Sequence, residues 1–203
     1  MKLNWAERWV VNNPLRVLEQ RLELRWMRNA HSIPEGAKVL EVGCGRGAGA
    51  DLIRQAFQPS PLYALDLDVR MVQKAKGYLS DHDGDDVSLT VGDIFRLPVR
   101  DEALDAVFGF GVLHHVPDWR GAAMEIARIL KTGGVYFIEE LYPSLYQNFL
   151  TKHILLHPKE DRFRSHDLKE ALQSIGLPIV NVLEFKKVGI LGVAVKKKVI
   201  SDR

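Results

Sequence analysis

The chain has 203 residues, enough for one compact domain that buries its own core without disulfides or metals. Hydrophobic residues make up 46% and charged residues 27%, as in ordinary globular proteins, and the net charge of +2 is too small to indicate a nucleic-acid partner. Cys44 is the only cysteine, which excludes an intramolecular disulfide and fits a reducing compartment.

The sequence predicts neither a secretion signal nor a membrane span. The first residues include Glu7 among mixed polar residues and lack the apolar core of a signal peptide. The longest strongly apolar stretch without Asp, Glu, Lys or Arg runs from Ala106 to Pro117, which is too short to cross a bilayer. We therefore expect a soluble, cytoplasmic protein.

Residues 1–32 form a segment of their own that is predicted to be helical. Asn13 is a suitable helix cap, and Pro14 suits the first helical turn. Apolar residues then recur at helical spacing, at Leu15, Leu18, Leu22 and Trp26. A shorter helix carrying Trp5 and Trp9 is expected before this one.

From residue 37 onward, strand-like and helix-like segments alternate. The predicted strands are mostly continuous apolar runs, typical of strands buried on both faces, at 37–42, 61–66, 87–91, 104–109 and 135–139. The predicted helices are 47–57, 68–79 and 118–130. The last of them is expected to start at Asp118 and to be stopped by Gly133 and Gly134. This alternation indicates a parallel, doubly wound α/β sheet.

The last third of the chain departs from this alternation. Residues 141–164 look irregular or helical, and a helix capped by Ser165 or Asp167 is expected to end near Gly176. Two β-rich runs, 179–186 and 190–199, then predict an antiparallel pair of strands.

The run from Ala37 to Gly49 is the most informative stretch. It predicts a buried strand, then a turn with glycines at 43, 45, 47 and 49, then a helix. Glycine tolerates positive φ and lets the backbone lie against a ligand, and the helix start offers unpaired N–H groups to a polar or anionic group. Dinucleotide-binding folds also place a glycine-rich turn between a strand and a helix, so the turn alone does not identify the kind of ligand-binding site. The acidic Glu41, two positions before the first glycine, narrows the choice of site.

Glu41-x-Gly43-x-Gly45-x-Gly47 resembles the first motif of class I S-adenosylmethionine-dependent methyltransferases, and further motifs follow in the family's order over residues 33–200. The resemblance is to the small-molecule group that includes the type 11 and the ubiquinone-menaquinone methyltransferases. It implies a Rossmann-like α/β fold with a seven-stranded, mostly parallel sheet of order 3-2-1-4-5-7-6, whose last strand is antiparallel.

On this resemblance the chain is expected to form a single methyltransferase domain over residues 1–203. Its parts would be a helical cover, a cofactor-binding core, an acceptor-side segment, and a C-terminal helix with the strand pair, at 1–32, 33–140, 141–164 and 165–203 respectively.

The resemblance implies S-adenosyl-L-methionine as the cofactor. Asp66, at the end of the second predicted strand, would accept hydrogen bonds from both ribose hydroxyls, whereas Asp68 fits a helix cap better. Leu67 and Met71 would flank the adenine, although a methionine in a first helical turn is by default a core residue.

The segment after the third predicted strand resembles the family's next motif. Asp93 would accept a hydrogen bond from the adenine amino group, and Ile94 would cover the ring edge. An aspartate at this place also suits a turn in which it binds its own backbone. At the first motif, Glu41 would organise the amino-acid end of the cofactor, and the turn of Gly43, Cys44, Gly45 and Gly47 would bind it. Cys44 would be a small packed residue of this turn rather than a nucleophile.

The segment after the fourth predicted strand would lie at the carboxyl edge of the sheet, where ligands bind. Gly109 and Phe110 would approach the sulfonium through their backbone. His114 and His115 are the candidate general bases, which hydroxyl or carbon acceptors need. Alternatively, one histidine packs and the other binds the backbone, and His114 is assigned mainly to the cofactor pocket.

The expected reaction is an in-line displacement at the methyl carbon that requires no metal, and the histidines show no convincing ligand spacing. The aromatic residues of 1–32 and 141–164 are consistent with a small, apolar or aromatic acceptor, and ordinary packing explains them equally well. The basic residues Arg21, Arg25 and Arg28 and the run 196–198 suit weak contact with a membrane surface or an anionic substrate, although solvated basic faces are the simpler explanation.

No nucleic-acid partner is expected, because none of the common RNA-binding signatures is visible. The sequence leaves the acceptor atom and the oligomeric state open. Two other functions stay open as well. One is a non-catalytic module that binds S-adenosylmethionine. The other is an NAD(P)-dependent oxidoreductase, since Gly43-x-Gly45-x-x-Ala48 also fits the dinucleotide fingerprint.

Overall fold

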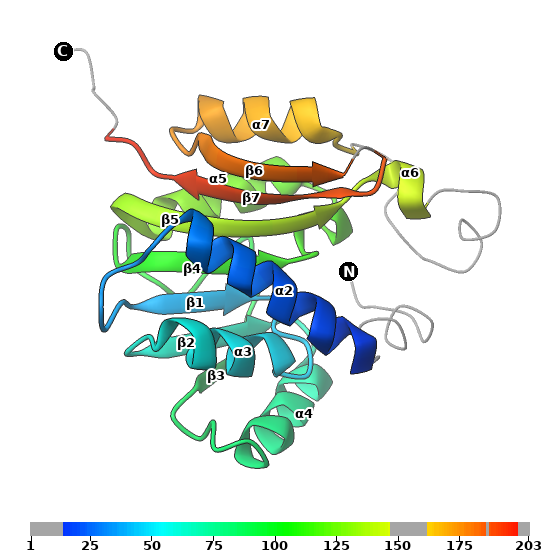
Figure 1. Ribbon diagram of the computed structural model, residues 1–203. Coiled ribbons are helices and arrows are strands. Elements are labelled where there is room, and N and C mark those ends of the chain that lie inside the picture. The colour runs from blue at the N-terminus through cyan, green and yellow to red at the C-terminus, as the bar shows by residue number, and fades with distance from the viewer. Residues whose placement is uncertain (1–13, 147–161, 186, 199–203) are drawn as a thin grey trace.

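The computed structural model describes residues 14–146, 162–185 and 187–198 (Figure 1). The strands are β1 (Val39–Val42), β2 (Leu62–Asp66), β3 (Ser88–Val91), β4 (Leu104–Phe110), β5 (Leu130–Leu141), β6 (Ile179–Phe185) and β7 (Gly189–Val195). The helices are α2 (Pro14–Ala30), α3 (Ala48–Phe57), α4 (Val69–Ser80), α5 (Trp119–Ile129), α6 (Pro143–Tyr146) and α7 (Ser165–Ser174), with a short 3-10 turn, η1 (Leu113–His115). The expected helix around Trp5 and Trp9 lies outside the described residues.

All seven strands belong to one sheet, in the order β3-β2-β1-β4-β5-β7-β6. The neighbouring pairs from β3 to β5 are parallel, whereas β7 is antiparallel to both β5 and β6. Figure 1 shows β7 running against its neighbours. The predicted fold class is therefore confirmed, including the strand order and the antiparallel last strand.

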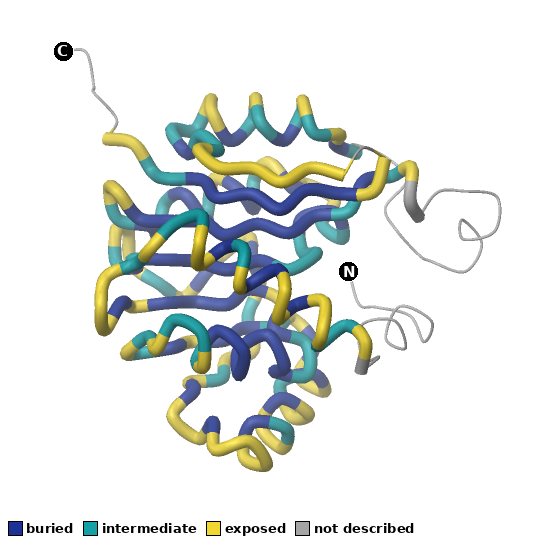
Figure 2. Tube along the Cα trace, viewed as in Figure 1, coloured by how far each residue is buried: buried dark blue, intermediate teal, exposed yellow. Residues whose placement is uncertain are grey.

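Helices cover both faces of this sheet. On one face, Leu24 and Met27 of α2 and Ile53 of α3 pack against Phe108 and Phe137 of the central strands. On the other face, α5 and α7 pack against the opposite side of the same strands through buried side chains that include Trp119, Ile126, Leu168 and Leu172. Figure 2 shows the central strands as the most deeply buried part of the chain. These two cores hold the carboxyl ends of the strands in fixed positions.

The boundary between α5 and β5 was predicted wrongly. The helix ends at Ile129 and the strand starts at Leu130, although Gly133 and Gly134 were expected to stop the helix. Leu130 is fully buried and pairs with Leu104 of β4, so the chain gains burial and sheet pairing by becoming extended early. Gly133, with φ of 82°, instead lies in an irregular start of β5, where the register with β4 shifts.

The start of α7 also differs in detail from the prediction. Its cap is Arg164 rather than Ser165 or Asp167. The Asp167 carboxylate nevertheless accepts a hydrogen bond from the Arg164 backbone N–H at 2.8 Å, so it binds the helix start from within the first turn.

Candidate active site

A cavity of about 450 Å³ opens at the carboxyl ends of β1, β2, β3 and β4. In a doubly wound sheet this edge is where ligands bind. The residues that line it are Gly43, Gly45, Leu65, Asp66, Leu67, Asp68, Met71, Gly92, Asp93, Ile94, Phe95, Phe110, Gly111, Val112, His115, Val116 and Pro117.

The glycine turn after β1 forms one wall of this cavity. Gly43 and Gly45 have φ of 70° and 53°, and Gly47 caps α3 with φ of 91°, so each adopts a conformation that L-residues with a Cβ disfavour. A Cβ on Gly43 would lie 2.7 Å from Cγ2 of Val112, which belongs to the segment after β4. The turn thus needs glycine both for its dihedral angles and for its close contact with the neighbouring segment.

Asp66 is held at the end of β2 by the glycine turn itself. Its Oδ2 accepts from the Gly45 N–H at 2.9 Å, and its Oδ1 accepts from the Asp68 N–H at 2.8 Å. Burial raises the pKa of this carboxyl above its ordinary value, while the two N–H donors oppose the shift. A carboxylate has about four acceptor positions, so acceptor capacity remains for a ligand. Asp68 caps α4 by accepting from the Arg70 N–H at 3.0 Å, as its expected capping role requires.

Glu41 lies behind the glycine turn and does not line the cavity. Burial, followed by the nearby Asp66 carboxylate, raises the pKa of Glu41 to about 8, although the Ala50 backbone N–H donates to it. Its Oε2 is buried and has no hydrogen-bond partner among the described residues. An unpartnered carboxylate oxygen at this depth is unfavourable unless a donor reaches it.

Cys44 is packed inside the turn and does not line the cavity. Burial, with the carboxylates of Glu41 and Asp66 nearby, raises the pKa of its thiol well above the ordinary value. The thiol therefore stays protonated near neutral pH, and a protonated thiol is a poor nucleophile. This placement agrees with a packing role for Cys44.

A largely apolar slot lies on the β2 and β3 side of the cavity. Met71 and Ile94 are buried there, and Leu67 is 45% exposed. Asp93 lines the same side while its Oδ1 accepts from the Phe95 N–H at 3.0 Å. Asp93 thus makes the turn bond that its residue type favours and still faces the cavity.

The segment after β4 forms the opposite wall, and it separates the two adjacent histidines. His115 lines the cavity, whereas the His114 ring is buried and its Nδ1 lies 2.7 Å from Oε2 of Glu140. Phe110 lines the cavity as well. Gly109 does not, and a Cβ there would lie 2.7 Å from Oη of Tyr136 in β5.

The structure therefore brings together nine of the predicted site residues around the cavity, namely Gly43, Gly45, Asp66, Leu67, Met71, Asp93, Ile94, Phe110 and His115. The other five lie behind its lining, namely Glu41, Cys44, Gly47, Gly109 and His114. His114 was expected mainly in the cofactor pocket, but its ring turns to Glu140, and of the two candidate bases it is His115 that lines the cavity.

Four charged residues near the site were not predicted. Glu140 is fully buried, and Glu139 is 6% exposed and pairs with Arg16 of α2 at 2.9 Å. Arg16 also pairs with the buried Glu23 at 2.8 Å. Burial raises the pKa of Glu139 to about 7 and that of Glu23 to about 8, with Arg16 opposing both shifts. The only signal in the sequence was a pair of glutamates at the end of an apolar strand.

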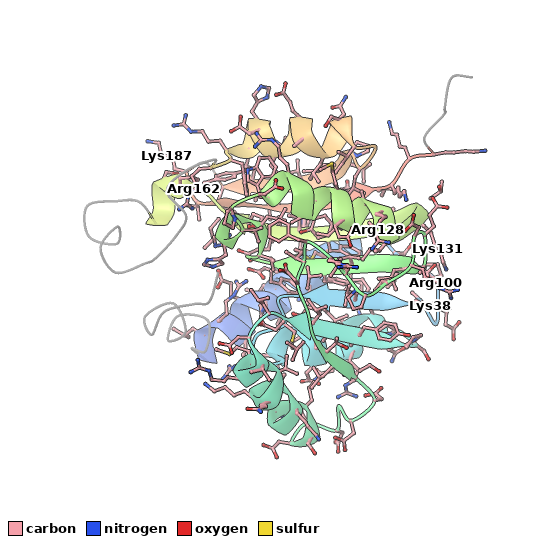
Figure 3. All side chains as sticks on the ribbon, turned by 180° about the vertical axis from the view of Figure 1, so that it is seen from behind. Lys38, Arg100, Arg128, Lys131, Arg162 and Lys187 are labelled. Carbon is pink, nitrogen blue, oxygen red and sulfur yellow. The ribbon has the colours of Figure 1, made fainter. Side chains whose placement is uncertain are left out.

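Positive side chains are distributed unevenly around the sheet. Figure 3 shows two groups of them at opposite ends of the strands. The end away from the cavity carries Lys38, Arg100, Arg128 and Lys131, and the end that holds the cavity carries Arg162 and Lys187. Among the described residues, no lysine or arginine lines the cavity itself. The part of the lining that the structure describes therefore offers three carboxylates and one histidine but no lysine or arginine.

In the part of the chain that the structure describes, no helix is long and apolar enough to cross a membrane. Among the same residues, no group of three or more His, Cys, Asp or Glu side chains is arranged to hold a metal ion.

The chain is similar in sequence to methyltransferases. Residues 40–138 match the family described as "Methyltransferase domain". The chain is 34% identical over 124 residues to sterol 24-C-methyltransferase ERG6B of Gibberella zeae, covering 59% of this chain and 32% of that protein. It is 32% identical over 109 residues to fatty-acid O-methyltransferase of Mycolicibacterium smegmatis, covering 54% and 39%. The match thus spans only 32% and 39% of the length of these two curated relatives.

Solved structures show the same fold. A chain of the complex between the Haloferax volcanii Trm112 methyltransferase activator and a putative methyltransferase superposes with a TM-score of 0.76 at 22% identity, covering 96% of this chain and 95% of that one. A putative methyltransferase from Bacillus halodurans superposes with a TM-score of 0.73 at 16% identity, covering 87% and 100%.

The sheet order, the antiparallel β7 and the glycine turn beside the cavity define a Rossmann-like methyltransferase fold. The domain match over residues 40–138 and this fold together support a class I S-adenosylmethionine-dependent methyltransferase. The cofactor of this family is S-adenosyl-L-methionine.

Proposed function

We propose that this chain transfers a methyl group from S-adenosylmethionine to a small apolar acceptor. The observation that carries the proposal is that the two sides of the cavity differ in polarity. Its three carboxylates, Asp66, Asp68 and Asp93, lie on the β2 and β3 side. The side after β4 is apolar, with Val112, Val116 and Pro117, and among the described residues His115 is the titratable group that lines it.

The residues on the carboxylate side fit the cofactor. Asp66 would accept from the ribose hydroxyls with the acceptor positions that the backbone leaves unused, and Asp93 would accept from the adenine amino group. Met71 and Ile94 would pack against the adenine ring. The unpartnered Oε2 of Glu41 suits the ammonium of the amino-acid end, directly or through water.

The bound cofactor supplies a methyl group already activated on a sulfonium. The protein therefore chiefly has to orient the acceptor, hold it in line and exclude water. The apolar wall of Val112, Val116 and Pro117 suits these tasks. For a hydroxyl or carbon acceptor, His115 would take the proton as the new bond to the methyl carbon forms and the carbon–sulfur bond breaks.

The proposed acceptor class rests on the lining and on the relatives. The described residues of this apolar wall include no lysine or arginine, which disfavours a strongly anionic acceptor. The sterol and fatty-acid methyltransferases among the curated relatives are named for lipophilic acceptors. A cytoplasmic location and weak contact with a membrane surface stay predictions.

Two alternatives make different predictions. A non-catalytic module would bind S-adenosylhomocysteine without transferring methyl groups. An NAD(P)-dependent oxidoreductase would prefer a dinucleotide, but the antiparallel β7 and the domain match favour the methyltransferase.

The test is transfer of label from methyl-labelled S-adenosylmethionine into a cell extract, followed by separation of lipid, small aqueous and macromolecular fractions. The proposal predicts label in the lipid fraction with the wild-type chain and none above background with Asp66→Ala. Label in the aqueous fraction would contradict the apolar acceptor, and no label in any fraction would favour the non-catalytic module.

A further inference from the structure

The carboxylate of Glu140 binds three consecutive residues of the segment after β4. Its Oε1 accepts from the N–H groups of Val112 and Leu113 at 3.1 and 2.7 Å. Its Oε2 accepts from the N–H of His114 at 3.1 Å and faces Nδ1 of the same residue at 2.7 Å. Glu140 itself is fully buried at the end of β5.

These bonds replace a cap that the local sequence lacks. The start of η1 leaves backbone N–H groups without partners in the turn, and such groups are usually bound by a Ser, Thr, Asp or Asn at the cap position. Here the cap residue is Val112, which has no side-chain acceptor. A side chain from the neighbouring strand therefore supplies the missing acceptor across 26 to 28 positions of sequence.

The same carboxylate also orients the His114 ring. A carboxylate only accepts hydrogen bonds, so Nδ1 of His114 must carry the proton that points at Glu140. The His114 carbonyl in turn accepts from Nη1 of Arg162 at 3.4 Å. His114 is thus bound at its backbone N–H, its ring and its carbonyl.

The segment held in this way forms the acceptor-side wall. Val112 lines the cavity and packs against the glycine turn so closely that Gly43 has no room for a Cβ. The next histidine, His115, lines the cavity. The centroids of the His114 and His115 rings lie 4.3 Å apart, and the two ring planes meet at 38°. Fixing the His114 ring therefore also limits where the His115 ring can lie.

We propose that Glu140 is a positioning residue for methyl transfer: by capping η1 and fixing the His114 ring, it sets the place of Val112 and His115 against the acceptor. The inference rests on the proposed function of the cavity. Glu140 does not line the cavity, so it acts on the acceptor only through the segment it holds. Its neighbour Glu139 has a different task, because it pairs with Arg16 of α2.

The test is the variant Glu140→Gln, compared with Glu125→Gln as the matched control. Glu125 also accepts a loop N–H, that of Leu97 at 2.8 Å, but it lies in α5 and does not line the cavity. In Glu140→Gln, an amide NH2 replaces one acceptor oxygen, so at least one of the four donors loses its partner. The glutamine side chain has nearly the same size and shape as that of glutamate.

Three readouts separate positioning from a general loss of structure. They are the dissociation constant of S-adenosylhomocysteine, kcat and KM for methyl transfer, and the 15N signals of the histidine rings. For Glu140→Gln we expect kcat to fall at least about tenfold, the dissociation constant to change less than about threefold, and the His115 ring signals to shift. For Glu125→Gln we expect all three to stay at wild-type values.

Unchanged kcat and unchanged His115 signals in Glu140→Gln would overturn the inference, as would a parallel loss of kcat and cofactor affinity. If the glutamine variant does not fold, Glu140→Asp keeps the charge but draws the carboxylate back, and the same criteria apply. If the wild-type chain transfers no methyl group, the proposed function fails. The positioning role is then decided by the His115 signals alone, and unchanged signals overturn it.

Discussion

At the scale of single residues, Gly49 shows how tightly the cofactor side is built. Gly49 lies in the first turn of α3, where an alanine would ordinarily favour the helix. A Cβ at this position would overlap the carboxylate of Glu41, which is buried behind the glycine turn. We therefore expect Gly49→Ala to lower the free energy of unfolding by about 1–3 kcal/mol, measured by urea denaturation.

Gly77 supplies the matched control for this substitution. It is an exposed glycine inside α4, and a Cβ there would meet nothing within 4 Å. Gly77→Ala should raise the free energy of unfolding by about 0.5–1 kcal/mol. If both alanine variants were stabilised alike, the close contact between Gly49 and Glu41 would be refuted.

At the scale of elements, α2 is joined to the sheet by a buried ion network as well as by apolar packing. Arg16 lies between Glu23 and Glu139, so its removal leaves two buried carboxylates without their cation. Losing one partner of a buried pair commonly costs about 3–5 kcal/mol. We expect Arg16→Met to lower the free energy of unfolding by about 3 kcal/mol, measured by chemical denaturation.

The exposed Arg21, one turn along the same helix, is the control for Arg16. Arg21→Met should change the free energy of unfolding by less than about 0.5 kcal/mol. Equal effects of the two substitutions would mean that the ion network does not hold α2 in place.

Local signals explain which parts of the site could be predicted. The glycine turn follows from four glycines after an apolar strand, and Asp66 and Asp93 follow from acidic residues at strand ends, because parallel strands bring these ends to one edge. The choice between His114 and His115 had no such signal. The two residues are adjacent and chemically identical. Only the bond between the His114 ring and Glu140 decides that His114 is buried and that His115 lines the cavity.

Contacts between distant segments explain most of what the sequence did not reveal. Arg16 and Glu139 are 123 positions apart, so no local pattern links them. The boundary of β5 was missed for a similar reason. Gly133 and Gly134 are compatible with a helix stop or an irregular strand, and the pairing of Leu130 with Leu104 decides between the two.

At the scale of the whole molecule, three buried glutamates make stability depend on pH. Burial raises the pKa of Glu41 and Glu23 to about 8 and that of Glu139 to about 7, all above the ordinary value of 4.5. The folded chain therefore holds protons that the unfolded chain releases between pH of about 4.5 and about 8. Their stabilising contribution is complete below about pH 4.5 and is lost as the pH rises through about 8.

We therefore expect the free energy of unfolding to fall between about pH 5.5 and about pH 8.5, measured by urea denaturation without cofactor. Glu41→Gln removes one of the three groups and should make this dependence shallower. At about pH 8.5 the variant should be more stable than the wild type by on the order of 2 kcal/mol. A wild-type stability that rises over this range would contradict the raised pKa values of these buried carboxyls.

Calorimetric titration of the chain with S-adenosylhomocysteine and, separately, with NAD+ tests the assignment of the cofactor site to Asp66 and the glycine turn. We expect one site for S-adenosylhomocysteine, no measurable binding of NAD+, and affinity for S-adenosylhomocysteine at least about tenfold weaker in Asp66→Asn. Asp105→Asn, at the amino-terminal end of β4, should bind like the wild type. Preferential binding of NAD+, or affinity for S-adenosylhomocysteine that does not depend on Asp66, would contradict this assignment.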